Sequence, residues 1–354
     1  MSQLFSPITL REITVRNRVW VSPMCEYSAV EGVPNDWHLV HLGSFARGRV
    51  GLVFTEATAV SPEGRISPAD TGIWNDEQQQ AWARIVAFVH GQGATAGMQL
   101  AHAGRKASSK PPWEGRGFVT DEDGGWVPVA PSAVAFPGLR EPAALDAVGI
   151  AGVVADFGDA AERAVAAGFD VLELHAAHGY LLHEFLSPLS NQRDDEYGGS
   201  FENRARLLME AVAEVRRRVA APLVVRISAT DWVEDGWTAD DSVRLASLLR
   251  DAGVDLVDVS SGGNAPADIP VEPGYQVPFA RRLRAEAGIP TGAVGLITEP
   301  KQAEEIVADG SADVVLLARA LLRDPHWALR AAHDLGVEVG QGIDWPKQYL
   351  RAAL

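Results

Sequence analysis

The sequence predicts a (β/α)8 barrel, an α/β fold in which eight parallel strands are each followed by a helix. From residue 19 onward, eight short apolar runs alternate with helical segments, and most connections between them are short. The first run is followed by Ser-Pro-Met-Cys, without the glycine-rich turn that opens a doubly wound dinucleotide-binding sheet. A length of 354 residues suits one barrel with insertions, so we expect residues 1–354 to form a single domain.

The strands and helices follow from the apolar periodicity of each segment. The expected strands are residues 19–21, 51–60, 95–106, 171–174, 222–229, 254–261, 290–295 and 312–319. The expected helices are residues 37–48, 82–90, 148–167, a segment after Phe201, 240–252, 275–287, 300–308 and 324–335.

Three segments lie outside this repeat. Residues 4–19 alternate apolar and polar side chains around Arg11 and Glu12, which predicts a hairpin that plugs the floor of the barrel. Residues 107–142, after the third strand, are rich in glycine, proline and tryptophan, which indicates a long loop excursion or lid. Residues 338–354 form a tail beyond the last helix.

Composition narrows the class of function. The net charge of −16 opposes binding to nucleic acid or to anionic membranes, and no apolar run approaches the roughly 18 residues that a membrane span needs. No basic and apolar leader follows Met1. The single cysteine, Cys25, excludes an internal disulfide and fits a reducing, cytoplasmic location.

The stretch DVLELHAAHGYLLHEFLSPLSN, residues 170–191, carries the most chemistry. It begins as a buried strand and ends in His175, His178 and Tyr180, which we expect just past the strand's carboxyl end, where parallel barrels place their sites. Two imidazoles can hydrogen-bond an oxygen that gains negative charge, and a phenol can deliver a proton to a neighbouring atom. Alternatively, a His-x-x-His pair can bind a metal ion.

The last two strands predict a phosphate site. Gly295 allows close backbone approach, while Ala318 and Arg319 place N–H groups and a guanidinium at a helix start. If the phosphate belongs to a cofactor lying across the barrel mouth, Arg226 could stabilise negative charge at its other end, and Gln99 could bond a ring amide. Flavin mononucleotide (FMN) has this shape.

Several motifs resemble the old yellow enzymes, specifically the thermophilic-like and xenobiotic reductase-like ene-reductases. They are SPMCEYS, VGLVFTEATAV, GMQLAHAGRK, ELHAAHGYLLHEFLSPLSNQRDDEYGGSFENR, VRISATD, TGAVGLIT and ARALLRDP. The resemblance implies that His175 and His178 bind the substrate oxygen and that Tyr180 donates the proton. It assigns FMN to Pro23, Met24, Cys25, Ala57, Gln99, Arg226, Gly295, Ala318 and Arg319, and the border of the substrate site to Tyr27 and Lys106.

The same resemblance implies a homodimer or homotetramer in which Arg351 of the tail enters the neighbouring subunit's pocket. It implies that NADPH or NADH reduces FMN, which then reduces an α,β-unsaturated carbonyl or nitro compound. Two alternatives remain open: a metal-dependent barrel hydrolase that uses His175 and His178 as ligands, and a flavin-binding redox sensor with little turnover.

Overall fold

The structure is a computed structural model that describes residues 2–340 and 342–353. Its centre is a closed barrel of eight parallel strands in the order β10-β11-β12-β3-β4-β5-β8-β9, which confirms the predicted fold. The barrel strands are β3 (Val19–Val21), β4 (Leu52–Ala59), β5 (Thr95–Ala101), β8 (Val171–Ala176), β9 (Leu223–Ser228), β10 (Leu256–Ser260), β11 (Thr291–Ala293) and β12 (Val314–Leu317).

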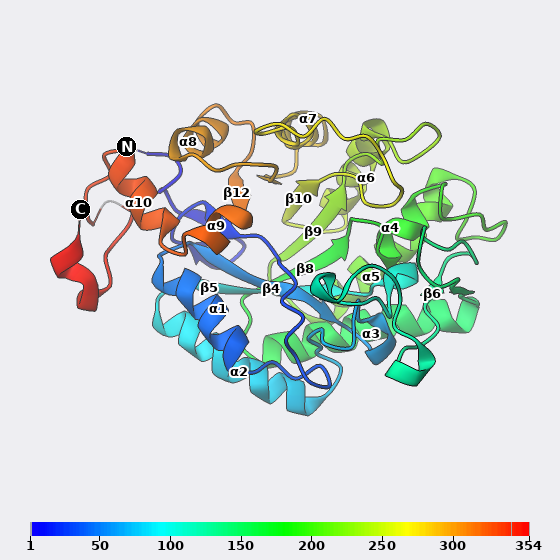
Figure 1. Cartoon of the computed structure of the whole chain (residues 1–354). Helices are drawn as coiled ribbons and strands as arrows, with labels where there is room; N and C mark the ends of the chain where they lie inside the picture. The colour runs from blue at the N-terminus through cyan, green and yellow to red at the C-terminus, as the bar shows by residue number, and fades with distance from the viewer. Residues whose placement is uncertain (1, 341, 354) are drawn as a thin grey trace.

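Helices surround this barrel, as Figure 1 shows. They are α1 (Asp36–Arg47), α2 (Asp76–Gly91), α3 (Ala147–Ala166), α4 (Leu181–Leu186), α5 (Phe201–Arg218), α6 (Ala239–Asp251), α7 (Val277–Ala287), α8 (Pro300–Ala308), α9 (Arg319–Arg323) and α10 (Trp327–Asp334). Polar side chains cap several of them: Asn35, Asn75, Asp146, Ser200 and Thr238 each accept a hydrogen bond from a first-turn backbone N–H.

Several local predictions were wrong. The strand expected over residues 95–106 ends at Ala101, and Gly104–Lys106 forms a 3-10 turn instead. Strand β8 continues through Ala176, so His175 lies within the strand and not beyond its end. The helix expected over residues 324–335 begins only at Trp327, as α10, because Asp324, which ends the preceding short helix α9, has the non-helical angles φ −140° and ψ 90°. Its carboxylate instead accepts from the backbone N–H of His326 and pairs with Arg330.

The N-terminal hairpin closes one end of the barrel. Strands β1 (Ile8–Leu10) and β2 (Ile13–Val15) pair antiparallel, as predicted. Leu10 and Val15 belong to one buried apolar cluster with inward-facing side chains of the barrel, among them Trp20 and Phe54. The floor of the barrel interior is therefore filled with apolar side chains, and its open end is the opposite one.

The 107–142 excursion folds back over the barrel mouth's rim. It contains three-residue 3-10 turns at Pro112–Glu114 and Asp121–Asp123, and strand β6 (Val129–Ala130), which pairs with β7 (Ala143–Ala144). Trp126 donates its indole N–H to the carbonyl of Glu63, and Arg65 lies over the same ring. The excursion is thereby tied to the loop after β4.

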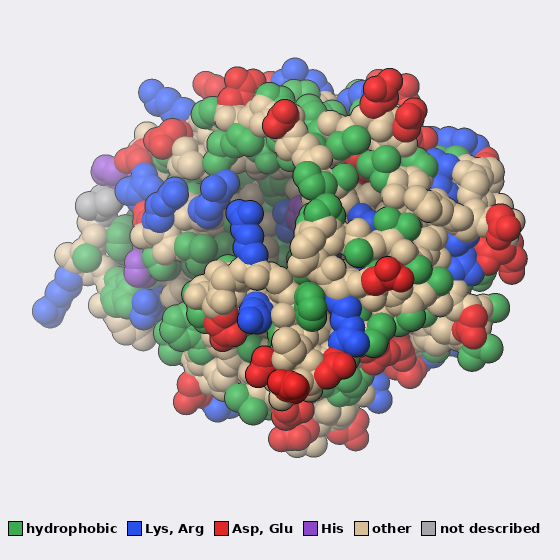
Figure 2. All heavy atoms as spheres, turned by 45° about the vertical axis from the view of Figure 1, so that its right-hand side comes forward, with side chains coloured by type: hydrophobic (Ala, Val, Ile, Leu, Met, Phe, Trp, Pro, Cys, Tyr) green, Lys and Arg blue, Asp and Glu red, His purple; other side chains and the backbone are tan. Residues whose placement is uncertain are grey.

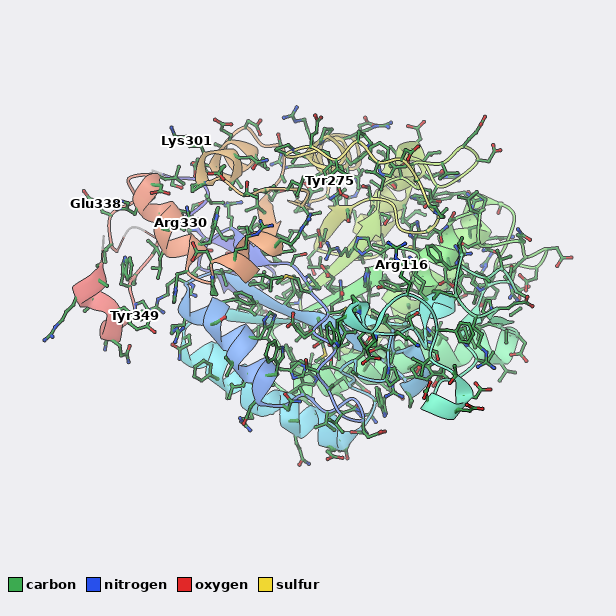
Figure 3. All side chains as sticks on the ribbon, in the orientation of Figure 1. Arg116, Tyr275, Lys301, Arg330, Glu338 and Tyr349 are labelled. Atoms are coloured by element: carbon green, nitrogen blue, oxygen red, sulfur yellow. The ribbon has the colours of Figure 1, made fainter. Side chains whose placement is uncertain are left out.

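The tail ends in a 3-10 segment, η5 (Lys347–Ala352). Tyr349 lies beside His326 and under Arg47, with ring centroids 5.9 Å apart for the first pair. In Figure 3, Tyr349 lies near the left edge of the molecule, well apart from Arg116 of the excursion. Among the helices within the described residues, none is long and apolar enough to cross a membrane.

Candidate active site

A cavity of about 180 Å³ opens at the carboxyl ends of β9 to β12 and of β3. Figure 2 shows a hollow in this face with Lys and Arg side chains along one edge. The cavity is lined by four of the expected cofactor residues, Arg226, Gly295, Ala318 and Arg319. Gly295 has φ +112°, a conformation that favours glycine.

Arg226 forms the inner wall of this cavity. Its Nη1 donates to Ser22 Oγ at 3.0 Å, and its Nε lies 3.1 Å from Asp258 Oδ2. Gln99 stands two strands away, on β5, where its Nε2 donates to Glu173 Oε1 at 2.7 Å. Arg226 and Gln99 are therefore held by buried carboxyl groups below them, and their remaining polar atoms are available to a ligand.

His175, His178 and Tyr180 form one cluster. The ring centroids of His175 and His178 are 5.1 Å apart, and those of His175 and Tyr180 are 4.9 Å apart. His178 Nε2 lies 2.7 Å from Ser260 Oγ, and Ser260 also lines the cavity. His175 Nδ1 is buried and has no hydrogen-bond partner among the described residues. The cluster thus borders the cavity with unused hydrogen-bonding capacity.

The pKa shifts of His175, His178 and Tyr180 all favour the uncharged form of each side chain. Burial, followed by the positive charge of Arg226, lowers the pKa of both His175 and His178 well below its usual value. Burial, followed by the negative charge that Cys25 would carry, raises the pKa of Tyr180. At neutral pH the site therefore offers two uncharged imidazoles and a protonated phenol.

The turn that carries His178 is held from two sides. Lys106 donates its ammonium to the carbonyls of His178, at 2.7 Å, and of Gly263. Burial lowers the pKa of Lys106 to about 8. A side chain on Gly263 would come within 2.7 Å of the His178 Cα, so this glycine is needed for close packing and not as a phosphate cradle.

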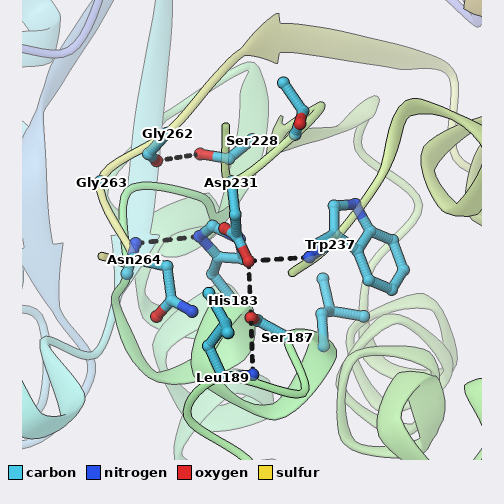
Figure 4. A network of polar contacts seen from close by, with 12 residues as sticks. His183, Ser187, Leu189, Ser228, Asp231, Trp237, Gly262, Gly263 and Asn264 are labelled. Atoms are coloured by element: carbon cyan, nitrogen blue, oxygen red, sulfur yellow. Dashed lines mark hydrogen bonds and ion pairs between the residues drawn. The ribbon is translucent and has the colours of Figure 1, made fainter. Parts of the chain in front are cut away.

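A second network holds the same turn from below (Figure 4). His183 Nδ1 accepts from the backbone N–H of Gly179 at 2.9 Å, and its Nε2 lies 3.1 Å from Asp231 Oδ1. Asp231 also accepts from Ser187 Oγ and from the backbone N–H of Trp237. Since Gly179 lies between His178 and Tyr180, this buried network sets the position of both side chains.

The residues after β3 and on β4 form the opposite rim. Cys25 lies beside the backbone N–H of Ala57 and beside the Tyr27 side chain. Burial, then the carboxylates of Asp70 and Glu56, raise the pKa of Cys25 well above its usual value. Tyr27 packs edge-on against Trp113 of the excursion, with ring centroids 5.6 Å apart. Pro23 and Met24 are partly buried between Ser22 and Cys25.

Arg351 is exposed in η5 and has no hydrogen-bond or ion-pair partner in the described part of this chain. Its expected entry into a neighbouring subunit stays a prediction. The cavity is also lined by five residues that were not predicted as site residues: Ser22, Ser260, Tyr275, Gln276 and Arg323. Ser22 and Ser260 stand at strand ends, so that position alone could have suggested them.

Comparisons with known proteins decide the family. The model of the NADH:flavin oxidoreductase / NADH oxidase family matches residues 3–338. The chain belongs to this family. It is 50% identical over 351 residues, covering 98% of each chain, to a protein of Geobacillus thermodenitrificans named NADPH dehydrogenase. The predicted membership of the old yellow enzymes is confirmed, and the chain is an oxidoreductase of that type.

Solved structures agree with this assignment. The old yellow enzyme homologue of Zymomonas mobilis is 26% identical, with a TM-score of 0.78 and 99% of each chain covered. Morphinone reductase in complex with tetrahydroNAD is 28% identical, with a TM-score of 0.79, covering 96% of this chain and 92% of that one. Membership of an oxidoreductase family argues against the hydrolase alternative. In residues 2–340 and 342–353, no group of three or more His, Cys, Asp or Glu side chains is placed to hold a metal ion.

The site residues fit the flavin that the family implies. For a phosphate, the cavity provides the exposed guanidinium of Arg319. It also provides the backbone of Gly295, where an added Cβ would lie close to the Gln276 side chain. Arg226 lines the same cavity and can face the polar edge of a ring. Donors for the phosphate and a cation for the ring thus line one opening, while Gln99 is held beside Glu173 on β5, outside the residues that line this cavity.

Proposed function

We propose that the chain is an FMN-dependent ene-reductase. Its substrates would be α,β-unsaturated ketones, aldehydes, imides or nitroalkenes, and its electron donor NADPH or NADH. When bound, FMN takes a hydride from the nicotinamide and supplies one to the β-carbon of the alkene. The observation that carries the proposal is the cluster of His175, His178 and Tyr180 beside the cavity.

The chain's own residues supply the remaining chemistry. His175 and His178 donate hydrogen bonds to the carbonyl or nitro oxygen of the substrate and stabilise the negative charge that it gains. If Ser260 donates its hydroxyl proton to His178 Nε2, the imidazole carries its own hydrogen on Nδ1, which is then free to donate. Tyr180 gives its phenolic proton to the α-carbon.

FMN would be held by the residues that the family resemblance assigns to it. In that assignment Arg319, Ala318 and Gly295 hold the phosphate, Gln99 and Arg226 hold the ring, and Pro23, Met24, Cys25 and Ala57 line its other side. Tyr27 and Lys106 would border the substrate, and the 107–142 excursion would act as a lid. We expect one domain per chain, a cytoplasmic homodimer or homotetramer, and Arg351 in the neighbouring pocket.

Replacing Tyr180 by Phe tests the mechanism, with Tyr197→Phe as the matched control, because Tyr197 bonds Glu210 and not the site. In Tyr180→Phe, reduction of the flavin by NADPH should persist, while its reoxidation by cyclohexenone should slow by about 10²- to 10⁴-fold. Stopped-flow absorbance separates the two half-reactions. An unchanged rate with cyclohexenone would refute Tyr180 as the proton donor. A flavoprotein that oxidises NADPH with no enone would favour the redox sensor.

A further inference from the structure

The interior of the barrel holds a charged layer directly below Gln99 and Arg226. Along β8, β9 and β10 the inward-facing positions are first apolar, with Val171, Val224 and Leu256 in the floor cluster. Because strand side chains alternate, the next inward positions are Glu173, Arg226 and Asp258. Glu173 and Asp258 are completely buried. Two acids and one base in a barrel core need an explanation, since apolar residues would be at least as stable there.

The partners of the two acids differ. Asp258 has the guanidinium of Arg226 within 3.1 Å. Glu173 Oε1 accepts from the neutral amide of Gln99, and Glu173 Oε2 is buried with no hydrogen-bond partner among the described residues. Both oxygens of Asp258 are also buried without a hydrogen bond among the described residues, so what distinguishes the two acids is the cation beside Asp258. A buried carboxylate is least unfavourable as an ion when an opposite charge lies next to it, so the geometry favours a protonated Glu173 beside an ionised Asp258.

The groups around Glu173 support this assignment. Gln99 faces it from β5, Arg226 from β9 and Asp258 from β10, while His175 lies two residues further along β8. Burial first, and then the carboxylate of Asp258, raise the pKa of Glu173 well above its usual value, against the opposing effect of Arg226. Protonated Glu173, ionised Asp258 and Arg226 carry no net charge together.

We infer that Glu173 is a positioning residue that works in its protonated form. It fixes the Gln99 side chain by accepting its Nε2 hydrogen, so that the Gln99 amide oxygen is presented to the ring amide of FMN, and it keeps the layer below the ring neutral. This inference rests on the proposed function. When Glu173 ionises at alkaline pH, an uncompensated negative charge appears below the ring, and adding electrons to the ring becomes less favourable.

Two variants separate the roles of Glu173. Glu173→Gln is neutral and of the same shape and keeps an acceptor for Gln99. Glu173→Met is neutral and of similar length but has no such acceptor. Asp156→Asn is the control, because Asp156 is a half-buried acid on α3, outside the barrel, whose pKa burial raises to about 6. All three are compared with the wild type as holoenzymes.

Infrared difference spectra of each variant against the wild type give the first readout, in which the bands of the carboxyl groups and not those of the flavin are compared. At neutral pH, the band of a protonated carboxyl group should be lost in Glu173→Gln and in Glu173→Met and kept in Asp156→Asn. If neither Glu173 variant loses such a band, the inference is overturned, whatever the outcome for FMN. Because either variant suffices, failure of one to fold leaves the test intact.

The flavin midpoint potential, titrated against pH, gives the second readout. Wild type and Glu173→Gln should agree near pH 7, and at alkaline pH the wild type should fall lower, by about 30 mV for a tenfold effect on the two-electron equilibrium. If the midpoint potential of Glu173→Gln already exceeds that of the wild type by this amount at pH 7, Glu173 is ionised in the wild type at that pH, and the inference is contradicted. FMN should bind Glu173→Met about fivefold to tenfold more weakly than Glu173→Gln, and equal affinities would contradict the role of Gln99. A wild type without flavin would instead refute the proposed function.

Discussion

The lower and upper halves of the barrel interior are built from the same strands but by different rules. Below, Trp20, Phe54, Val171 and their neighbours form a closed apolar cluster under the N-terminal hairpin. Above, two or four residues further along the strands, the interior positions carry carboxyl, guanidinium, imidazole and hydroxyl groups. The lower half has the composition that stabilises a fold, whereas the upper half keeps polar groups whose partners are incomplete. The difference shows that the apolar core and the polar site can be separated by only two residues along a strand, the distance between successive inward-facing side chains.

The largest effect on stability should come from the lower half. Phe54 packs edge-on against Trp20, and a Cβ on Gly97 would come within 2.5 Å of its ring, so the space around it is full. Phe54→Ala should lower the free energy of unfolding by about 3–5 kcal/mol without changing turnover per folded, flavin-bound enzyme. Denaturant titration measures this, and Phe88→Ala, at a partly exposed phenylalanine of α2, should cost far less. If both variants lose the same free energy of unfolding, the lower half of the barrel interior is not the more tightly packed region.

The upper half should show the opposite response. His178→Ala removes a hydrogen-bond donor to the substrate oxygen and should slow alkene reduction by about 10²- to 10³-fold. Its free energy of unfolding should change much less than that of Phe54→Ala, since His178 is only partly buried. Single-turnover kinetics and denaturant titration on the same preparation give both quantities. A large loss of stability with normal alkene reduction would assign His178 to the core.

The buried histidines should make the free energy of unfolding depend on pH. Burial lowers the pKa of His102, which directly follows β5, to about 4 from its usual value of 6.5. Since the folded state disfavours the protonated imidazole, its contribution to stability is complete above pH 6.5 and is lost as the pH falls toward 4. That loss amounts to about 3 kcal/mol, and His175 and His178 act in the same direction. His102→Gln should flatten the dependence of unfolding free energy on pH in this range. An unaltered slope in His102→Gln would contradict this assignment.

The smallest effect should come from the network below the active-site turn. Asp231→Asn weakens the hold on His183 and hence on the Gly179 backbone between His178 and Tyr180. Alkene reduction should slow by roughly tenfold, while the reduction of the flavin by NADPH should change little. Asp241→Asn, in the N-terminal cap of α6, is the control. If Asp231→Asn slows both half-reactions equally, the network supports the whole barrel rather than this turn.

The periodicity of the sequence was enough to predict the barrel, the hairpin floor and the excursion, because each depends on local apolar patterns. The strand ends also predicted Arg226, Gly295, Ala318 and Arg319 at one mouth, and the cavity brings these four together. The carboxyl layer was missed although the signal was present, since Glu173 and Asp258 are single acids within the apolar strands VLELHA and LVDVS. The His183–Asp231 network could not be predicted, because it joins helix α4 to a residue of the loop after β9, whose conformation depends on tertiary packing.

The measurement that tests the central claim most directly is the absorption spectrum of the purified protein, followed through two anaerobic additions. We predict flavin bands of bound FMN, their bleaching on addition of NADPH, and their return when cyclohexenone is added. A protein that shows no flavin bands and takes up no FMN when it is offered would contradict the account.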